Sequence, residues 1–244
     1  MLISKQYEAL LGAVENTGKG SVQTLFYHFM LFPIWPQDSY FVTREKGETS
    51  VLELKRSGAS ILAAYLVMWP AMIGFWTGAF AIVQAVIPEV LIPIDDDPMI
   101  LEQPIGVWAF GVFSVLMILV GLLAWVFTRR PLSAVERKQR LVWEELTGSR
   151  ADLAQLPDPW SLRDDFKRAI RDVVESGGAG RDGFDSWHRY ALDPRFAHPS
   201  FLKLALAVSR IYVGHPQDGM NPEQMRQLFD QIWARLVQVD PSLR

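Results

Sequence analysis

The fold of this chain is decided by two stretches, GASILAAYLVMWPAMIGFWTGAFAIVQAVIP (Gly58–Pro88) and PIGVWAFGVFSVLMILVGLLAWVFT (Pro104–Thr128). Neither stretch contains an acidic, basic or histidine residue. Each is longer than the ~20 residues that an α-helix needs to cross ~30 Å of hydrocarbon. A helix in a soluble protein is rarely apolar on every face, because one face usually meets water. The two stretches therefore predict a transmembrane hairpin of two helices.

The rest of the 244 residues is organised around this hairpin. We expect an all-α membrane protein in which the two-helix transmembrane hairpin is followed by a C-terminal cytoplasmic helical bundle. Residues 1–56 are expected to form a cytoplasmic or interfacial N-terminal segment, residues 57–128 the hairpin with an acidic external loop at 89–103, and residues 129–244 the cytoplasmic helical domain. The chain is long enough for one hairpin and one modest soluble domain.

Basic residues flank the hairpin on one side only. Arg44, Lys46, Lys55 and Arg56 precede it, and Arg129, Arg130, Arg137, Lys138 and Arg140 follow it. The connecting loop has no Lys or Arg and carries Glu89, Asp95, Asp96, Asp97 and Glu102. By the positive-inside rule, both termini lie in the cytoplasm and the loop lies outside, and the expected location is a bacterial inner membrane. The three consecutive aspartates lack the spacing and the glycine of a calcium-binding loop, so we interpret them as a solvated acidic loop.

The bulk composition excludes several classes of function. A net charge of −3 does not favour nucleic-acid binding, and the absence of cysteine excludes a disulfide framework, a thiolate nucleophile and a Cys-ligated metal. Glu8 and Glu15 interrupt the apolar core that an N-terminal signal peptide would need. The first membrane helix is therefore expected to act as the targeting signal and to be retained.

The N-terminal segment has apolar residues at helical spacing and is expected to begin with a short amphipathic helix, marked by Leu2, Ile3, Tyr7, Leu10, Leu11 and Val14. It ends in the turn-rich stretch NTGKGS, which lacks the spaced glycine and the Ser or Thr of a phosphate-binding loop. The aromatic stretch at residues 25–36 is too short to span a bilayer. It is either an interfacial foot or part of an apolar core shared with the C-terminal domain.

Residues 40–54 also allow two interpretations. Ser50 and Glu53 have the spacing of a capping box, which predicts a helix that runs into the membrane. A hairpin that turns at Lys46-Gly47 is the competing interpretation.

Small residues line one face of the first membrane helix at Gly74, Gly78, Ala81 and Ala85. Such a face lets another helix approach closely, so we predict a helix-packing surface. Its partner is either the second helix, through Gly111 or Gly121, or another subunit. Because both stretches lack ionisable side chains, a transporter or pump acting alone is disfavoured.

The chain after Pro131 has the periodicity of a soluble helical bundle of about four helices. Ser133 and Glu136 form a capping box for a helix that extends to about Thr147, and Asn221-Pro222 is a second start signal. Between these helices, Asp185, His188, Asp193 and His198 lie close together in sequence. Their spacing matches no zinc signature, and we expect the histidines to carry neither catalysis nor an essential metal.

The sequence leaves two classes of function and a weaker third. We expect a non-enzymatic membrane scaffold, without cofactor or metal, in a larger complex such as a secretion or conjugation-type machine. Its partners would be other membrane subunits at the hairpin, a cytosolic protein at the C-terminal domain and the lipid bilayer, but no nucleic acid. The first alternative is a signalling or exclusion-type membrane protein, for which the short acidic loop makes a poor receptor. The weaker alternative is a membrane-tethered enzyme that uses the Asp185–His198 region.

Overall fold

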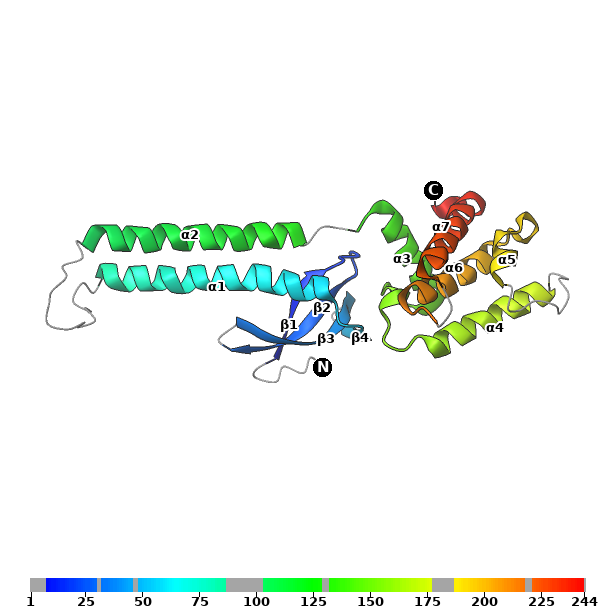
Figure 1. Cartoon of the computed structure of the whole chain (residues 1–244), viewed down its shortest axis with the longest axis horizontal. Helices are drawn as coiled ribbons and strands as arrows, with labels where there is room; N and C mark the ends of the chain where they lie inside the picture. The colour runs from blue at the N-terminus through cyan, green and yellow to red at the C-terminus, as the bar shows by residue number, and fades with distance from the viewer. Residues whose placement is uncertain are drawn as a thin grey trace. The chain divides into compact units, whose positions relative to one another are not determined.

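The computed structural model describes residues 8–29, 32–45, 48–86, 103–128, 132–176, 187–217 and 221–243. These residues form two compact units. One unit contains the N-terminal strands up to Leu52 and two long helices, and the other contains residues 53–55 and the chain from Leu132 onward (Figure 1).

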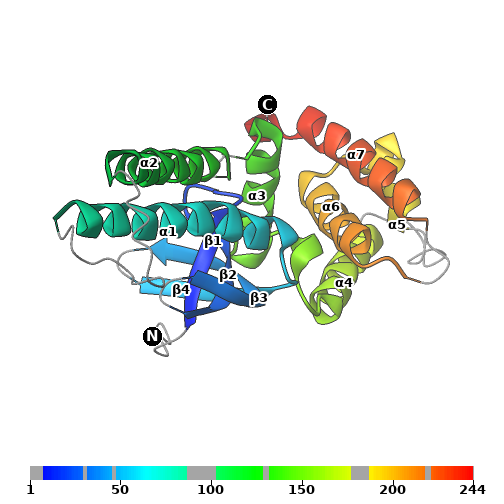
Figure 2. The ribbon, with the colours of Figure 1, turned by 60° about the vertical axis from the view of Figure 1, so that its left-hand side comes forward.

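The two long helices of the first unit are α1 (Gly58–Val86) and α2 (Gln103–Thr128). They run side by side in opposite directions, as Figures 1 and 2 show. By length and composition, both are apolar enough to cross a membrane. The acidic loop lies outside the described residues, and so do Arg129 and Arg130.

A four-stranded antiparallel sheet precedes the helices, in the order β1-β2-β3-β4. The strands are β1 (Glu8–Val14), β2 (Gly20–Phe29), β3 (Phe32–Glu45) and β4 (Glu48–Leu54). The prediction of an all-α protein was therefore wrong for the N-terminal segment. The predicted amphipathic helix is wrong where it covers β1, and the predicted helix start at Ser50 is wrong because Ser50 lies in β4. The competing hairpin interpretation gave the right element type, although Lys46 and Gly47 themselves lie outside the described residues.

The physical reasons for this error are visible in β1 and β2. In β2, Val22, Thr24 and Phe26 are buried in strict alternation, which is the period of a strand that is buried on one face. In β1 the register shifts between Leu11 and Val14, so its apolar residues no longer alternate and imitate helical spacing.

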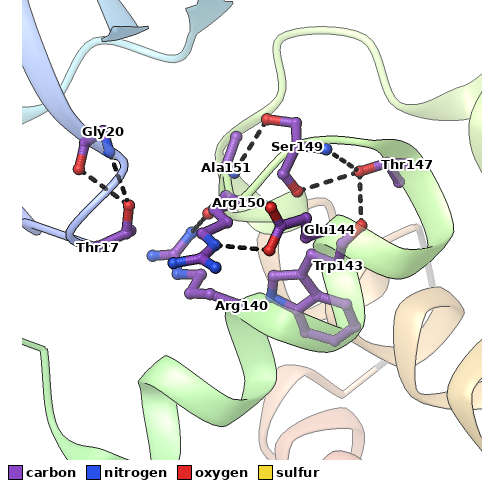
Figure 3. A network of polar contacts seen from close by, with 9 residues as sticks. All are labelled: Thr17, Gly20, Arg140, Trp143, Glu144, Thr147, Ser149, Arg150 and Ala151. Carbon is purple, nitrogen blue, oxygen red and sulfur yellow. Dashed lines mark hydrogen bonds and ion pairs between the residues drawn. The ribbon is translucent and has the colours of Figure 1, made fainter. Parts of the chain in front are cut away.

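The stretch NTGKGS forms the turn between β1 and β2. Gly18 has φ +82°, and its N–H donates to Asn16 Oδ1 at 2.9 Å. A left-handed backbone of this kind favours glycine. Thr17 Oγ1 and the main chain of Gly20 are hydrogen-bonded across the same turn (Figure 3).

The second unit is built around one buried helix, α6 (Pro199–Gly214). Among the described residues, the other helices are α3 (Ala134–Thr147), α4 (Trp160–Ser176), α5 (Trp187–Leu192) and α7 (Pro222–Val239), with single 3-10 turns at η1 (Leu153–Gln155), η3 (Pro194–Phe196) and η4 (Pro241–Leu243). The predicted capping box of Ser133 and Glu136 is confirmed, as are the end of α3 at Thr147 and the Asn221 cap of α7. Residues 53–55 belong to this unit, where the Lys55 N–H donates to Gln155 O and Lys55 Nζ donates to Gly214 O.

Candidate functional site

The glycines of α1 lie against α2. A Cβ on Gly74 would come within 2.8 Å of both Ser114 O and Ile118 Cγ1, and a Cβ on Gly78 would come within 2.6 Å of Ser114 Oγ. The Ser114 hydroxyl donates a 2.6 Å hydrogen bond to Gly74 O. The close approach of the two backbones therefore depends on the missing side chains of Gly74 and Gly78.

The packing continues along the hairpin in both directions. Towards the start of α1, a Cβ on Gly121 would lie 3.1 Å from Val67 O and 3.2 Å from Ala71 N. In the other direction, Phe80 and Phe110 meet edge to face at 5.4 Å. These pairs set the antiparallel register, in which Gly121 lies level with residues 67–71 of α1.

The remaining small residues of the predicted surface differ in their surroundings. Ala81 is buried, whereas Ala85 is exposed. Gly111, one of the two glycines considered as a partner, has no atom within 4 Å of the place a Cβ would take. Within the described residues, the Gly74 and Gly78 face thus has a partner inside the same chain, while contact with another subunit stays a prediction.

The outward faces of the hairpin expose large apolar side chains. They include Phe75, Trp76, Ile82 and Val83 on α1, and Trp108, Val112, Val115, Leu116, Leu119, Leu122, Leu123 and Val126 on α2. Only 11% of each candidate span is buried inside the protein. The two helices bury a narrow seam against each other and leave the rest of their apolar surface uncovered.

The sheet is joined to the start of α1 by a close backbone contact. Gly12 in β1 has φ +68°, and a Cβ there would overlap the carbonyl group of Ser60. The Ser60 hydroxyl donates to Gly12 O at 2.7 Å. Both the left-handed conformation and the lack of a side chain are therefore needed at Gly12.

A second set of hydroxyl contacts supports this junction from the sheet. Ser39 Oγ lies 2.8 Å from Thr24 Oγ1 across β2 and β3, and it accepts the N–H of Ser57 at 2.8 Å. Ser57 Oγ in turn accepts the N–H of Ser60 at 3.2 Å. Because Thr24, Ser39 and Ser60 are buried, their hydroxyl groups need these partners. The network fixes the direction in which α1 leaves the sheet.

A cavity of ≈ 240 Å³ lies between β1, α1 and the end of α2. Its wall combines the main chain around Gly12 and Ala13 with Ala63 and Ala64 of α1 and Trp125 of α2. The sheet, the start of α1 and the end of α2 thus meet around this cavity, within the first unit.

The bundle contains a buried carboxylate between two arginines. Asp152 caps η1 through Ala154 N–H, lies 3.7 Å from Arg140 Nη2 of α3, and accepts the Nε–H of Arg210 of α6 at 2.8 Å. Burial alone raises the pKa of the Asp152 carboxyl, but the Arg210 hydrogen bond and the charges of Arg140 and Arg210 hold that pKa below its ordinary value. Asp152 thus links α3, η1 and α6 as an ionised group.

The turn that follows α3 is held by a further polar network, shown in Figure 3. Arg150 Nε donates to Glu144 Oε2 at 2.7 Å, and Arg140 Nη1 donates to Arg150 O. Thr147 Oγ1 donates to Trp143 O and accepts the N–H of Ser149. These contacts close the C-terminal end of α3.

The Asp185–His198 region is not brought together as a site among the described residues. Asp185 lies outside them. Asp193 caps η3 and is paired with Arg195 at 2.6 Å, and the Arg195 hydrogen bonds lower the pKa of Asp193 to about 2. His198 lies at the start of α6 without a side-chain capping bond.

The two other histidines of the second unit have lowered pKa values. His188 is exposed, but partial desolvation of its ring beside Trp187 and the nearby charge of Arg189 lower its pKa. Burial, with the charge of Lys55, lowers the pKa of His215. Within the described ranges, no three His, Asp or Glu side chains are placed to hold a metal ion.

No family model, no curated protein and no solved structure matches this chain. A functional proposal therefore rests on two features of the structure. One is the hairpin with the sheet that packs on it, and the other is the helical bundle.

Proposed function

We propose that this protein is an integral membrane scaffold, in which the helical hairpin spans a bacterial inner membrane and both termini lie in the cytoplasm. The hairpin would contact other membrane subunits, and the C-terminal bundle would recruit a cytosolic protein to a larger complex, for example a secretion or conjugation-type machine. No enzymatic step is proposed.

The observation that carries the membrane assignment is the exposed apolar surface of α1 and α2. A soluble protein rarely exposes a contiguous apolar patch larger than a few hundred Å². Here the side chains of two long helices are exposed along most of their length. The hydrocarbon core of a bilayer covers such a surface without the free-energy penalty that exposing apolar side chains to water would carry.

The orientation is supported by the one-sided distribution of basic residues. Single cysteines at Lys46, Asp96 and Ser149, introduced into the cysteine-free chain, test it in intact cells. An impermeant thiol reagent should label only Asp96→Cys. Labelling of Ser149→Cys instead would reverse the orientation, and full release of the protein by alkaline carbonate would refute membrane insertion.

The scaffold role is supported by the way the sheet is fastened to α1. The Gly12–Ser60 contact and the Ser39 network join an N-terminal sheet to the hairpin as one unit, which suits a protein that fixes partners relative to a membrane. Purification of the full chain in mild detergent should yield a defined complex with both membrane and soluble proteins. A lone chain with bound metal would favour an enzyme.

The proposal that the protein is not an enzyme is tested at the two histidines of the Asp185–His198 region. His188→Gln and His198→Gln should leave complex formation and biological activity unchanged, since His198 makes no capping bond and His188 is exposed. Loss of activity with normal folding and membrane insertion would contradict this part of the proposal.

A further inference from the structure

One end of the β2–β3 pair is uncharged and aromatic. We define this aromatic end as residues 26–29 and 32–36, where Phe26 pairs with Pro36 and Tyr27 pairs with Trp35. No Asp, Glu, Lys or Arg occurs between Lys19 and Asp38. Tyr27, Ile34 and Trp35 are nevertheless exposed, at 46%, 54% and 66%. An exposed group of this kind needs something apolar to cover it.

The aromatic end lies along α1, beyond the hydroxyl junction. Tyr65 packs edge to face on Phe26 at 5.5 Å, and Trp69 packs on Phe32 at 5.0 Å. At the opposite limit, Arg56 just before α1 donates to Gln37 O, next to Asp38. Within β2 and β3, charged residues therefore begin at the level of Arg56 and Asp38, and the two strands become apolar in the direction in which α1 becomes apolar. The neighbouring strand β1 brings one acidic residue, Glu8, into register with Tyr27.

The register of the hairpin gives the depth of this contact. Trp69 lies level with Gly121, because Gly121 faces Val67 and Ala71. The apolar span of α2 continues for seven residues beyond Gly121, to Thr128. At 1.5 Å per residue, seven residues correspond to about 10 Å. Measured from Thr128 towards Gly121, the aromatic end therefore extends about 10 Å alongside α2.

Several main-chain polar groups of the aromatic end are absent or hydrogen-bonded within the protein, so they do not need water as a partner. Pro33 and Pro36 have no N–H to satisfy. The Pro33 carbonyl accepts the indole N–H of Trp69 at 3.3 Å, and the Ile34 carbonyl accepts the Tyr65 hydroxyl at 3.0 Å. Two α1 side chains thus satisfy carbonyl groups that would otherwise need water, as is required of backbone close to hydrocarbon.

We propose that the aromatic end of the β2–β3 pair enters the interfacial layer of the membrane beside α1, with the lipid bilayer as its partner. The inference rests on the proposed insertion of the hairpin. Tyr and Trp favour the headgroup level, where the ring meets acyl chains and the polar atom meets water. The exposed side chains continue the apolar surface of α1, which exposes Leu62, Leu66 and Trp69 at the same levels.

The inserted strands would also set the depth of α1. A helix of 29 residues is about 43 Å long and exceeds the ~30 Å of hydrocarbon. Sliding of α1 along its axis would move Trp35 and Ile34 out of their layer or draw Asp38 towards it. Both movements are unfavourable, so the strands would hold the helix at one height.

Fluorescence quenching tests the proposal on the full chain, which has no natural cysteine. Single cysteines at Trp35, Val115 and Arg44 are labelled with an environment-sensitive fluorophore after reconstitution into phosphatidylcholine–phosphatidylglycerol vesicles. Lipids carrying a spin label either near the headgroup or deep in the acyl chain act as quenchers. Ile34→Cys, at a neighbouring exposed position, repeats the measurement should Trp35→Cys fold poorly.

We expect Val115 to be quenched by the deep label, Trp35 several-fold more by the shallow than by the deep label, and Arg44 by neither. A Trp35 signal equal to that of Arg44, with Val115 still quenched, would overturn this inference and leave membrane insertion standing. A Val115 site that no lipid quenches would refute both. Shielding of Trp35 from aqueous iodide without lipid quenching would assign the aromatic end to a protein contact and also overturn the proposal.

Discussion

Helix α6 in the bundle and helix α2 in the hairpin are both strongly apolar, yet their surroundings are opposite. In α6, Leu202, Ala205 and Leu206 have no exposed surface, because the other helices and η1 enclose them. In α2, Trp108 is 74% exposed and Leu119 is 49% exposed. The bundle covers its apolar helix with its own residues, whereas most apolar side chains of α2 are not covered by other residues of the protein.

The difference shows where the free energy of each unit originates. Burial of apolar surface contributes about 25 cal/mol per Å² to stability in water. The bundle therefore gains stability by removing the side chains of α6 from water. In the proposed membrane, the hairpin would gain little in this way, and its helices would associate through close packing at glycine and the hydrogen bond between Ser114 and Gly74. Substitutions should therefore have effects that depend on the unit, not on the exposure of the side chain alone.

The largest effect is expected at Asp152, whose carboxylate links η1 to Arg140 of α3 and to Arg210 of α6. Asp152→Ala would leave Arg140 and Arg210 without their buried carboxylate, and breaking such a pair costs about 3–5 kcal/mol. Thermal unfolding of the full chain in detergent measures the loss. An unchanged midpoint would mean that the cluster does not hold the bundle together.

The same carboxylate predicts a pH dependence. The pKa of folded Asp152 lies below the unfolded value of about 3.9. Its contribution to stability is therefore complete above pH ~4 and is lost as the pH falls through the folded pKa. Asp193 and Asp240 also have lowered pKa values, so the comparison must be with Asp152→Asn, whose unfolding midpoint should fall less steeply below pH ~4.

The comparison between the units is most direct at two leucines of similar exposure, Leu119 in α2 at 49% and Leu141 in α3 at 45%. Leu119→Arg should cost about 2.5–3.5 kcal/mol of membrane insertion if α2 spans the bilayer. Leu141→Arg should stay within about 0.5 kcal/mol, because that side chain meets water. The fraction that resists carbonate extraction reports the first cost, and thermal unfolding reports the second. Equal, small effects at both sites would show that α2 does not lie in lipid.

Much of this architecture could be predicted from local sequence patterns. The lack of charge in the two long stretches marks α1 and α2, and the caps at Ser133 and Asn221 mark the starts of α3 and α7. Each of these signals is complete within one segment, so no distant contact is needed to interpret it.

The sheet could not be recognised in the same way. Its pairing depends on β1, whose irregular register hides the strand period, and on β2, where Leu25 and Tyr27 add apolar residues to the less buried face. A usable signal was present in Thr17-Gly18 between two strand-like runs, which is typical of a tight turn. Likewise, the GxxxG spacing indicates a packing face, but Ser114 and Ile118 become its partners only through the register of the hairpin.

Two glycines with positive φ separate the effect of backbone conformation from the effect of a close contact. Gly12 and Gly18 both have positive φ, but a Cβ would overlap Ser60 only at Gly12 and would meet no atom within 4 Å at Gly18. Gly18→Ala should cost about 1–2 kcal/mol from the left-handed backbone alone. Gly12→Ala should cost more, because the sheet must also move away from α1. Equal midpoints of thermal unfolding in the two variants would contradict the proposed junction.

A further effect is expected at the seam between α1 and α2. Gly74→Leu places bulk against Ser114 and Ile118, and such overpacking typically costs 1–3 kcal/mol. Gly111→Leu is the matched control, because the same change on α2 meets open space. Crosslinking of cysteines at Phe80 and Phe110, whose rings are 5.4 Å apart, should slow in the first variant and not in the second.

The same seam decides whether the glycine face serves one chain or two. The Ser114 hydroxyl is bonded to Gly74 O, so a second chain at this face would have to displace a contact already made within the hairpin. We therefore expect a cysteine at Gly78 to form a disulfide with a second cysteine introduced at Ser114 of α2 in the same chain. Capture of another chain by that cysteine, with the Phe80–Phe110 crosslink still intact, would show that both contacts form together. Loss of both on Gly74→Leu would then identify the hairpin as the element on which assembly depends.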